Sequence, residues 1–286
     1  MVNAAVPSAW RTGRVRAAGV TLATYEAGSD AGDAPAVLLL HGLGHWTDGA
    51  WGRLVPLLDP RLRCVAIDLP GFGASEKPDV RYDPAFFRRI LDAAVEAIGI
   101  GRCALIGHSL GGLVAADWAG AHPDRVTHLA LIAPAAFSRT PRHLIFALLA
   151  SGPGRLLFNA RPSRQFVAGT LRNAVFDQGS IDPAQIELAV ELARDRALRR
   201  AFGSVYAAAV KTLAHRKALH ADFARYTGPV FCAWGTHDRY INASSLRDVI
   251  RVYPRATTLL LDRSAHLPMI EQPHELAAAL NAFFAS

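Results

Sequence analysis

The chain has 286 residues, of which 51% are hydrophobic, and it carries a formal net charge of +7 from 31 Lys and Arg against 24 Asp and Glu. This length and composition allow one large α/β core. The basic residues form no stripe interleaved with aromatic residues, which argues against nucleic-acid binding. No apolar run reaches the ~18 residues of a membrane span and no signal peptide is evident, so we expect a cytoplasmic protein without stable membrane insertion.

Cysteine and histidine usage excludes two further classes. The three cysteines, Cys64, Cys103 and Cys232, are too few and too scattered for a disulfide framework or a zinc site. Each lies in or beside an apolar run, so we expect buried free thiols. The 11 histidines show no H-E-x-x-H or comparable spacing, and no metal site is predicted.

Two segments that alternate in polarity open the chain, RVRAAG (14–19) and VTLATYEAG (20–28). They predict an antiparallel hairpin at a sheet edge. Continuous apolar runs typical of buried parallel strands follow at 37–41, 64–68, 103–107, 128–133, 230–234 and 257–261. Helical periodicity occurs at 84–98, 111–121, 246–252 and 274–284. The pattern predicts an α/β fold with an eight-stranded, mostly parallel sheet and helices on both faces.

The strand rhythm stops between Ala133 and Thr227. This stretch includes DPAQIELAVELARDRALRRAF (182–202), which predicts a charged helix capped by Asp182 with Pro183 at its first position. We therefore expect a helical cap at residues 134–226, inserted after the sixth strand. The core would then consist of residues 1–133 and 227–286.

The stretch GHSLGG (107–112) places Ser109 where a buried strand turns sharply into a helix. The glycines Gly107, Gly111 and Gly112 remove side chains that would collide as the strand and the helix fold back on each other. Such a turn holds its central residue in a strained conformation above the carboxyl ends of the strands. It also places the N–H of Leu110 at a helix N-terminus, where an oxyanion would form.

A serine hydroxyl becomes a good nucleophile when a histidine takes its proton and a third group orients the histidine. Asp238 follows the run at 230–234 and His266 follows the run at 257–261, so both are expected at the same sheet edge as Ser109. Alternatives remain for each role. Asp262 and Asp248 are the other candidate acids, and His237 and His274 are the other candidate histidines.

Several stretches resemble those of serine hydrolases with the α/β-hydrolase fold, esterases and lipases with a helical cap. They are LLLHGLGH (38–45), DLPGFGASEKP (68–78), GHSLGG, GTHD (235–238) and AHLPMIEQP (265–273). The resemblance covers nearly all of the chain except the cap. It implies that Ser109 is the nucleophile, His266 the base and Asp238 the acid, with the backbone N–H groups of Leu43 and Leu110 in the oxyanion hole and no cofactor. The candidates for the substrate pocket are Gly42, His45, Trp46, His108 and Leu267, and His41 is expected to brace the oxyanion loop.

The resemblance favours hydrolysis of a small-molecule carboxylic ester with an apolar acyl part through an acyl-serine intermediate. Similar families hydrolyse a carbon–carbon bond of a diketone-type substrate with the same triad, but they commonly carry an aromatic residue where this chain has Leu267. Similar epoxide hydrolases and haloalkane dehalogenases use an Asp nucleophile, which Ser109 excludes. Outside the enzymes, the alternative is a receptor or accessory protein of this fold with little turnover.

Residues 125–176 contain seven arginines and no acidic residue. The apolar stretches HLIFALLA (143–150) and RLLF (155–158) have helical spacing and are expected to roof a hydrophobic pocket above Ser109. The arginines either form a solvated outer face or, in one or two cases, draw substrates with an anionic or polar end toward the entrance.

Overall fold

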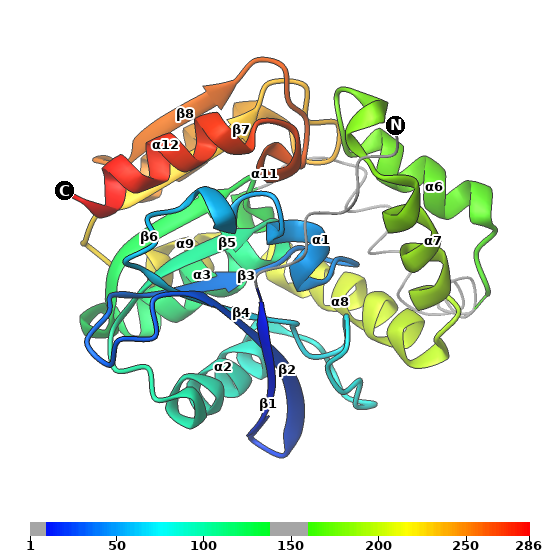
Figure 1. Cartoon of the computed structure of the whole chain (residues 1–286), viewed down its shortest axis with the longest axis horizontal. Coiled ribbons are helices and arrows are strands. Elements are labelled where there is room, and N and C mark those ends of the chain that lie inside the picture. The colour runs from blue at the N-terminus through cyan, green and yellow to red at the C-terminus, as the bar shows by residue number, and fades with distance from the viewer. Residues whose placement is uncertain (1–9, 138–159) are drawn as a thin grey trace.

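The computed structural model describes residues 10–137 and 160–286. Its centre is an eight-stranded sheet of order β1-β2-β4-β3-β5-β6-β7-β8, shown in Figure 1. The strands are β1 Arg11–Ala17, β2 Val20–Gly28, β3 Ala36–Leu40, β4 Arg63–Ile67, β5 Cys103–His108, β6 Val126–Ile132, β7 Val230–Gly235 and β8 Thr257–Leu261. β1 pairs antiparallel with β2, β2 antiparallel with β4, and every other pair is parallel. The predicted sheet and its edge hairpin are confirmed.

The helices predicted outside the cap are present. The described helices are α1 Thr47–Trp51, α2 Pro84–Ile98, α3 Leu110–Ala121, α6 Arg164–Asn173, α7 Pro183–Leu192, α8 Arg196–Ala214, α9 Arg216–Phe223, α10 Leu246–Val252, α11 Pro268–Glu271 and α12 Pro273–Phe284. α2 and α10 have the predicted bounds, while α3 and α12 begin one residue earlier than predicted. The Asp83 side chain caps α2 by accepting from the Phe86 N–H at 3.0 Å.

Each central strand is apolar on both sides because helices cover both faces of the sheet. Leu38 and Leu40 belong to a buried cluster that includes residues of α2, α3 and α10. Val37 and Leu39, which point the other way, belong to a second cluster with residues of α1, α11 and α12. Successive strand residues face opposite sides, so a continuous apolar run is what a doubly covered strand requires.

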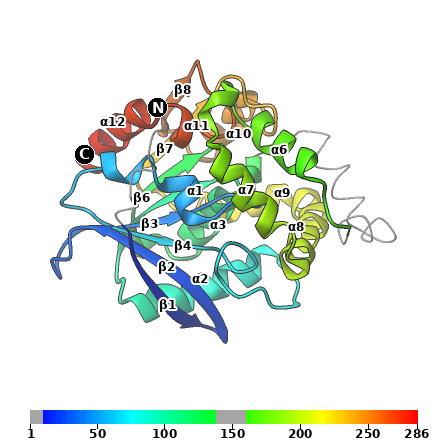
Figure 2. The same ribbon diagram turned by 45° about the vertical axis from the view of Figure 1, so that its right-hand side comes forward.

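Between β6 and β7 the described residues form α6, α7, α8 and α9. Both ribbon views place α6, α7 and α8 together beyond one end of the sheet (Figure 1, Figure 2). α9 instead packs against α3 of the core. The apolar stretches 143–150 and 155–158 lie outside the described residues.

The expected single helix at 182–202 is wrong, because α7 ends at Leu192 and α8 begins at Arg196. Asp195 starts the new helix, since its side chain accepts from the Ala197 N–H at 2.8 Å. Arg199 Nη1 donates to the carbonyls of Ala193 and Arg194, both at 2.8 Å, and so satisfies backbone acceptors at the end of α7. The Asp182 cap is confirmed, with its carboxylate 2.8 Å from the Ala184 nitrogen.

The expectation that the three cysteines are buried free thiols is confirmed. Cys64, Cys103 and Cys232 are buried and unbridged in β4, β5 and β7. Burial raises the pKa of Cys64 and of Cys103 to about 12, which keeps these thiols protonated. Within residues 10–137 and 160–286, no helix has the length and hydropathy needed to cross a bilayer.

Asp117 is a buried carboxylate on α3, 5% exposed, with Arg88 Nη1 3.6 Å from its Oδ1. Burial raises its pKa from 3.8 to about 6, and Arg88 only partly opposes this shift. Because the folded pKa lies above the unfolded value, the ionised form costs stability above pH 6, and the cost disappears as the pH falls toward 4.

We therefore expect Asp117→Asn to stabilise the fold at pH 8, by at most about 3 kcal/mol. The gain should shrink as the pH falls from about 6 toward 4, where the wild-type carboxyl is protonated as well. Thermal unfolding of both proteins across this pH range measures the difference, with the exposed Asp124→Asn as control. A variant that is less stable at pH 8, or a difference independent of pH, would contradict the prediction.

Candidate active site

Ser109 lies between β5 and α3 with φ 52° and ψ −112°, a conformation that a non-glycine residue adopts only under strain. The end of β6 and the residues after it hold it there. The Ser109 N–H donates to the Ile132 carbonyl at 3.0 Å, and the Ser109 carbonyl accepts from the Ala135 N–H at 2.9 Å. Backbone hydrogen bonds thus maintain the turn predicted from the sequence.

The glycines around Ser109 permit the close approach of strand and helix. A Cβ on Gly111 would lie 2.0 Å from the Leu40 carbonyl oxygen, and one on Gly107 would lie 2.4 Å from the Gly111 carbonyl oxygen. A Cβ on Gly112 would lie 2.8 Å from Pro134 Cβ. The collisions expected at these three positions are confirmed, and two of them involve backbone atoms that cannot rotate away.

Asp238 and His266 form a hydrogen-bonded pair at the same edge of the sheet. His266 Nδ1 lies 2.8 Å from Asp238 Oδ2, and the two residues are 9% and 4% exposed. Asp238 Oδ1 accepts from the N–H groups of Tyr240 and Ile241, both at 2.8 Å. The ionised carboxylate accepts from Nδ1–H, so the ring is left with Nε2 as its free acceptor.

The loops that carry the pair lie directly against each other. A Cβ on Gly235, at the end of β7, would lie 2.1 Å from the Ala265 carbonyl oxygen. The His237 N–H donates to the Ser264 carbonyl at 3.0 Å, and the Thr236 N–H donates to the Leu261 carbonyl at 3.0 Å. The glycine that begins GTHD thus allows the contact between the two loops.

The alternative acids and histidines have other partners or positions. Asp248, on α10, pairs with Arg251 at 2.8 Å, and Asp262 accepts from Thr236 Oγ1 at 3.3 Å. His237 Nδ1 lies 3.0 Å from Thr236 Oγ1, and His274 is an exposed residue of the first turn of α12. Of the candidate acids, the structure brings Asp238 to His266.

His108 connects Ser109 with His266. Its Nε2–H donates to the His266 carbonyl at 2.8 Å, and the two rings lie 4.8 Å apart between centroids. On the other side, a Cβ on Gly42 would lie 2.7 Å from His108 Nδ1 and 3.2 Å from Ser109 Cβ. Burial lowers the pKa of His108, so the ring is neutral. The serine, the histidine loop and the loop that carries Leu43 therefore meet around His108.

A neutral histidine also braces the loop that carries Leu43. His41 Nδ1–H donates to the Gly42 carbonyl at 2.8 Å, and its Nε2 accepts from the Leu69 N–H at 2.9 Å. Burial lowers the pKa of His41. Asp68 Oδ1 lies 3.9 Å from Nε2, but a nitrogen that accepts an N–H carries no proton, so the contact is not an ion pair.

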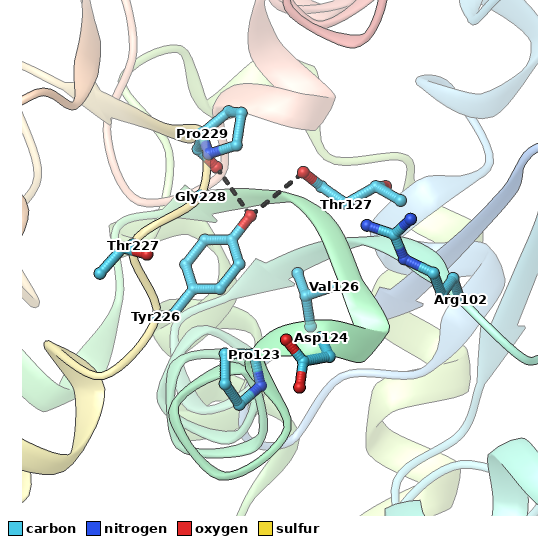
Figure 3. A pocket seen from close by; sticks show the side chains of 9 residues that line it. All are labelled: Arg102, Pro123, Asp124, Val126, Thr127, Tyr226, Thr227, Gly228 and Pro229. Atoms are coloured by element: carbon cyan, nitrogen blue, oxygen red, sulfur yellow. Dashed lines mark hydrogen bonds between the residues drawn. The ribbon is translucent and has the colours of Figure 1, made fainter.

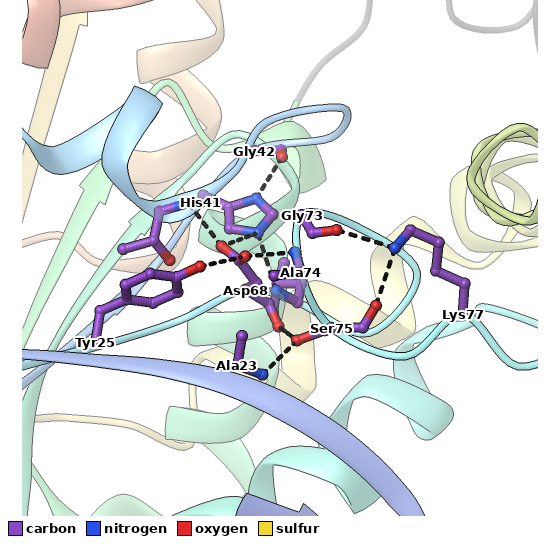
Figure 4. Close-up of polar contacts among 11 residues, drawn as sticks. Ala23, Tyr25, His41, Gly42, Asp68, Gly73, Ala74, Ser75 and Lys77 are labelled. Carbon is purple, nitrogen blue, oxygen red and sulfur yellow. Dashed lines mark hydrogen bonds and ion pairs between the residues drawn. The ribbon is translucent and has the colours of Figure 1, made fainter. Parts of the chain in front are cut away.

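Asp68 anchors the same loop to the rest of the core, as Figure 4 shows. Its carboxylate accepts from the Thr47 N–H at 2.7 Å, from the Ala74 N–H at 2.8 Å and from the Tyr25 hydroxyl at 3.0 Å. Its carbonyl accepts from Ser75 Oγ, which itself accepts from the Ala23 N–H at 2.9 Å. Lys77 Nζ donates to the carbonyls of Gly73 and Ser75. Residues 68–77 are thus tied to β2 and to the start of α1.

The other pocket candidates lie in two places. The His45 ring lies 6.2 Å from the His108 ring and 6.0 Å from the Trp46 ring, and burial lowers the pKa of His45 to about 3. Gly44, with φ 74°, would place a Cβ 3.0 Å from Phe202 of α8, so α8 lies against the loop that carries Leu43. Leu267 is fully buried in the cluster beneath α12.

A cavity of about 510 Å³ lies elsewhere (Figure 3). It is lined by residues that include Arg102, Asp124 and Tyr226, whose hydroxyl donates to the carbonyls of Thr127 and Pro229. These residues lie at the amino-terminal ends of β6 and β7, whereas Ser109 follows the carboxyl end of β5. The cavity is therefore at the opposite edge of the sheet from the candidate site.

The arginine-rich stretch is only partly described. Arg139, Arg142 and Arg155 lie outside the described residues. Arg164 on α6 is exposed and pairs with Glu187 on α7. An exposed ion pair of this kind is expected if the arginines form a solvated outer face.

Sequence reasoning missed two residues beside His266. The Tyr240 ring lies 5.4 Å from the His266 ring, and Glu271 accepts from the Ala265 N–H at 2.7 Å. In the sequence, only their positions near the candidate acid and histidine could have indicated these residues. Tyr240 follows GTHD closely, and Glu271 lies inside AHLPMIEQP.

Comparisons with known proteins agree with the fold. The family model described as alpha/beta hydrolase fold matches residues 35–273. A 2-hydroxy-6-oxo-6-(2'-aminophenyl)hexa-2,4-dienoic acid hydrolase from Metapseudomonas resinovorans is 24% identical over 89% of this chain and 85% of its own length. A pimeloyl-[acyl-carrier protein] methyl ester esterase from Aeromonas hydrophila is 29% identical over 88% of this chain and 96% of its own. The structure of a bacterial membrane phospholipase A superposes with a TM-score of 0.78 at 28% identity, covering 97% of this chain and 86% of that one.

The close contact between Gly111 and β3 can be tested by a substitution that adds one methyl group. Gly111→Ala should destabilise the fold by about 1–3 kcal/mol, because the new Cβ meets a backbone carbonyl, and it should reduce activity by displacing Ser109. Gly101→Ala is the matched control, since a Cβ there meets nothing within 4 Å. Chemical denaturation measures both variants. Equal stability of the two would show that α3 does not depend on this contact.

Proposed function

The chain belongs to the alpha/beta hydrolase fold family, and on that premise we propose that it hydrolyses carboxylic esters through an acyl-serine intermediate. The observation that carries the proposal is the Asp238–His266 pair, joined at 2.8 Å next to the strained Ser109 turn. A nucleophile, a base and an orienting acid at one sheet edge are the parts that acyl transfer requires.

In the first half-reaction, His266 Nε2 takes the proton of Ser109 Oγ as the oxygen attacks the ester carbonyl carbon. Asp238 holds the imidazole in the tautomer that can accept this proton and stabilises the imidazolium that results. The tetrahedral intermediate then collapses, the bond between the carbonyl carbon and the alcohol oxygen breaks, and the imidazolium gives its proton to the leaving alcohol. Ser109 is left acylated.

In the second half-reaction, His266 takes a proton from water, and the hydroxide oxygen attacks the acyl-serine. The second tetrahedral intermediate breaks the bond to Ser109 Oγ, which regains its proton from His266. The product is the carboxylic acid. The overall reaction consumes one water and requires no oxidant, reductant or cofactor.

Both tetrahedral intermediates carry an oxyanion, and we assign its stabilisation to the backbone N–H groups of Leu43 and Leu110. Leu110 is the first residue of α3, where an N–H has no partner within the helix. Leu43 lies next to Gly42, whose position against Ser109 and whose carbonyl bond to His41 hold the loop. Removing one such donor typically costs about 10²–10³ in kcat.

An apolar acyl group fits the surroundings of this site. Phe202 of α8 covers Gly44 beside Leu43, and its ring lies 5.3 Å from that of Tyr206. Aromatic side chains above the oxyanion loop favour an apolar group on the substrate over a charged one.

A second candidate reaction is the hydrolysis of a carbon–carbon bond, which the name of the relative from Metapseudomonas resinovorans suggests. Two observations favour the ester. The esterase from Aeromonas hydrophila shares more identical residues with this chain, at 29% against 24% identity. Leu267 also stands where the carbon–carbon hydrolases commonly carry an aromatic residue, and it is fully buried. Comparing kcat/KM for a p-nitrophenyl ester and for a vinylogous diketone separates the two reactions.

The nucleophile is tested by Ser109→Ala. Turnover of a p-nitrophenyl ester should fall by about 10³-fold or more, because triad residues act as a unit. The circular dichroism spectrum and Tm should be close to those of the wild type. A correctly folded Ser109→Ala protein with near wild-type turnover would show that another residue attacks the ester.

The acid is tested by Asp238→Asn with Asp262→Asn as its control. The amide cannot orient the imidazole as the carboxylate does, and a loss in kcat of about 10⁴-fold is expected by comparison with serine proteases. Asp262 is exposed and bonds Thr236 instead of His266, so Asp262→Asn should change kcat by less than about 3-fold. A large loss in kcat for Asp262→Asn together with a small loss for Asp238→Asn would assign the role of the acid to Asp262.

A further inference from the structure

Residues 170–177, the end of α6 and the turn after it, lie against both loops that carry the candidate triad, and we call them the brace segment. Hydrogen bonds join it to the Asp238 loop, to His266 and to Glu271 of α11. Among them are Tyr240 Oη to the Thr170 carbonyl at 2.9 Å, Arg239 Nη1 to Asn173 Oδ1 at 3.2 Å, the His266 N–H to the Ala174 carbonyl at 2.8 Å, and the Phe176 N–H to Glu271 Oε1 at 2.5 Å. The brace segment is thus fastened to the residues that orient the imidazole.

Glu271 is the link between the brace segment and the His266 loop. On one side its Oε2 accepts from the Ala265 N–H at 2.7 Å and from Ser264 Oγ at 3.1 Å. On the other side its Oε1 accepts from the Phe176 N–H at 2.5 Å and from the Asp177 N–H at 3.3 Å. Each oxygen of one carboxylate therefore receives two donors from a different segment.

These bonds hold the two consecutive peptide N–H groups on either side of the Ala265 Cα. The Ala265 N–H is bound by Glu271, the next N–H, that of His266, is bound by Ala174, and Phe176, two residues further, returns to Glu271. The hydrogen bonds close a ring through the histidine backbone. A shift of the His266 backbone would strain its own bond to the Ala174 carbonyl and the charge-assisted bonds that Ala265 and Phe176 donate to Glu271.

We propose that Glu271 is a positioning residue for the ester hydrolysis proposed above, and this inference rests on that proposed function. It fixes the backbone of His266 to the brace segment, so that the imidazole keeps its place between Asp238 and Ser109. Glu271 itself takes no part in proton transfer. It acts through His266.

The chemistry of the link requires a carboxylate. A glutamine in the same place has one acceptor oxygen, and its NH₂ group would face either the N–H groups of Phe176 and Asp177 or the Ala265 N–H and the Ser264 hydroxyl. Glu271→Gln must therefore release either the His266 loop or the brace segment. Since small misplacements of reacting groups cost up to about 10²-fold in rate, we expect kcat to fall by about 10- to 100-fold with KM within about 3-fold of the wild type.

A double-mutant comparison separates positioning from a general loss of structure. In a His266→Ala background the imidazole is absent, so Glu271→Gln should leave the residual esterase rate unchanged within about 2-fold. The matched control is Glu275→Gln, in the first turn of α12, whose carboxylate accepts from Gln272 Nε2 at 3.0 Å and should leave kcat at the wild-type value. Tm is measured for every variant.

Two results would overturn the inference. One is a folded Glu271→Gln protein with wild-type kcat. The other is a Glu271→Gln substitution that reduces the esterase rate by the same factor in the presence and in the absence of His266. Should Glu271→Gln not fold, Ser264→Ala takes its place, because it removes one of the two bonds on the histidine side and should lower kcat by about 3-fold only when His266 is present. Failure of the proposed function would show itself separately, as an active Ser109→Ala protein.

Discussion

The close crossing of α3 over the ends of β3 and β5 is the constraint on which the rest of the site depends. A Cβ on Gly111 or Gly107 would lie within 2.4 Å of a backbone oxygen, so the helix reaches its position only without these side chains. That position forces Ser109 into its left-handed conformation and sets the N-terminus of α3 beneath the same point. The Gly42 loop also lies close to Ser109, since a Cβ on Gly42 would lie 3.2 Å from Ser109 Cβ, and the loops of Asp238 and His266 meet at Gly235. The glycines, which have no side chain, therefore allow the segments that carry Ser109, Asp238 and His266 to pack closely together.

Near this crossing lie buried neutral histidines, and two of them, His45 and His108, are close to the histidine that the proposed reaction protonates. His41 and His108 each donate to a backbone carbonyl, and burial lowers the pKa of both as well as that of His45. Proximity to His266 lowers the pKa of His45 and His108 further. When His266 becomes an imidazolium during the proposed reaction, its neighbours stay uncharged. None of these histidines then repels the positive charge on His266, and Asp238 stabilises that charge.

The sheet and its flanking helices could be predicted because their signals are local. Continuous apolar runs such as LLL in β3 follow from helices on both faces, and the bounds of α2 follow from Asp83 and Pro84. The turn at Ser109 was predictable because its glycines are adjacent in sequence. The break between α7 and α8 was missed, since 182–202 keeps its helical periodicity across the Asp195 cap and the Arg199 bonds that end α7. Glu271 was missed because its partners Phe176 and Asp177 are about ninety residues away along the chain. A carboxylate that collects distant backbone donors leaves no periodic signal.

The central claim is that Ser109 carries an acyl group during turnover. Rapid acid quenching during hydrolysis of a p-nitrophenyl ester, followed by mass spectrometry of the intact protein and its peptides, tests this claim most directly. We expect a mass increase equal to the acyl group on the peptide that contains residues 107–112, appearing together with a burst of nitrophenol. Steady turnover with no adduct and no burst, or an adduct on a different residue, would contradict it.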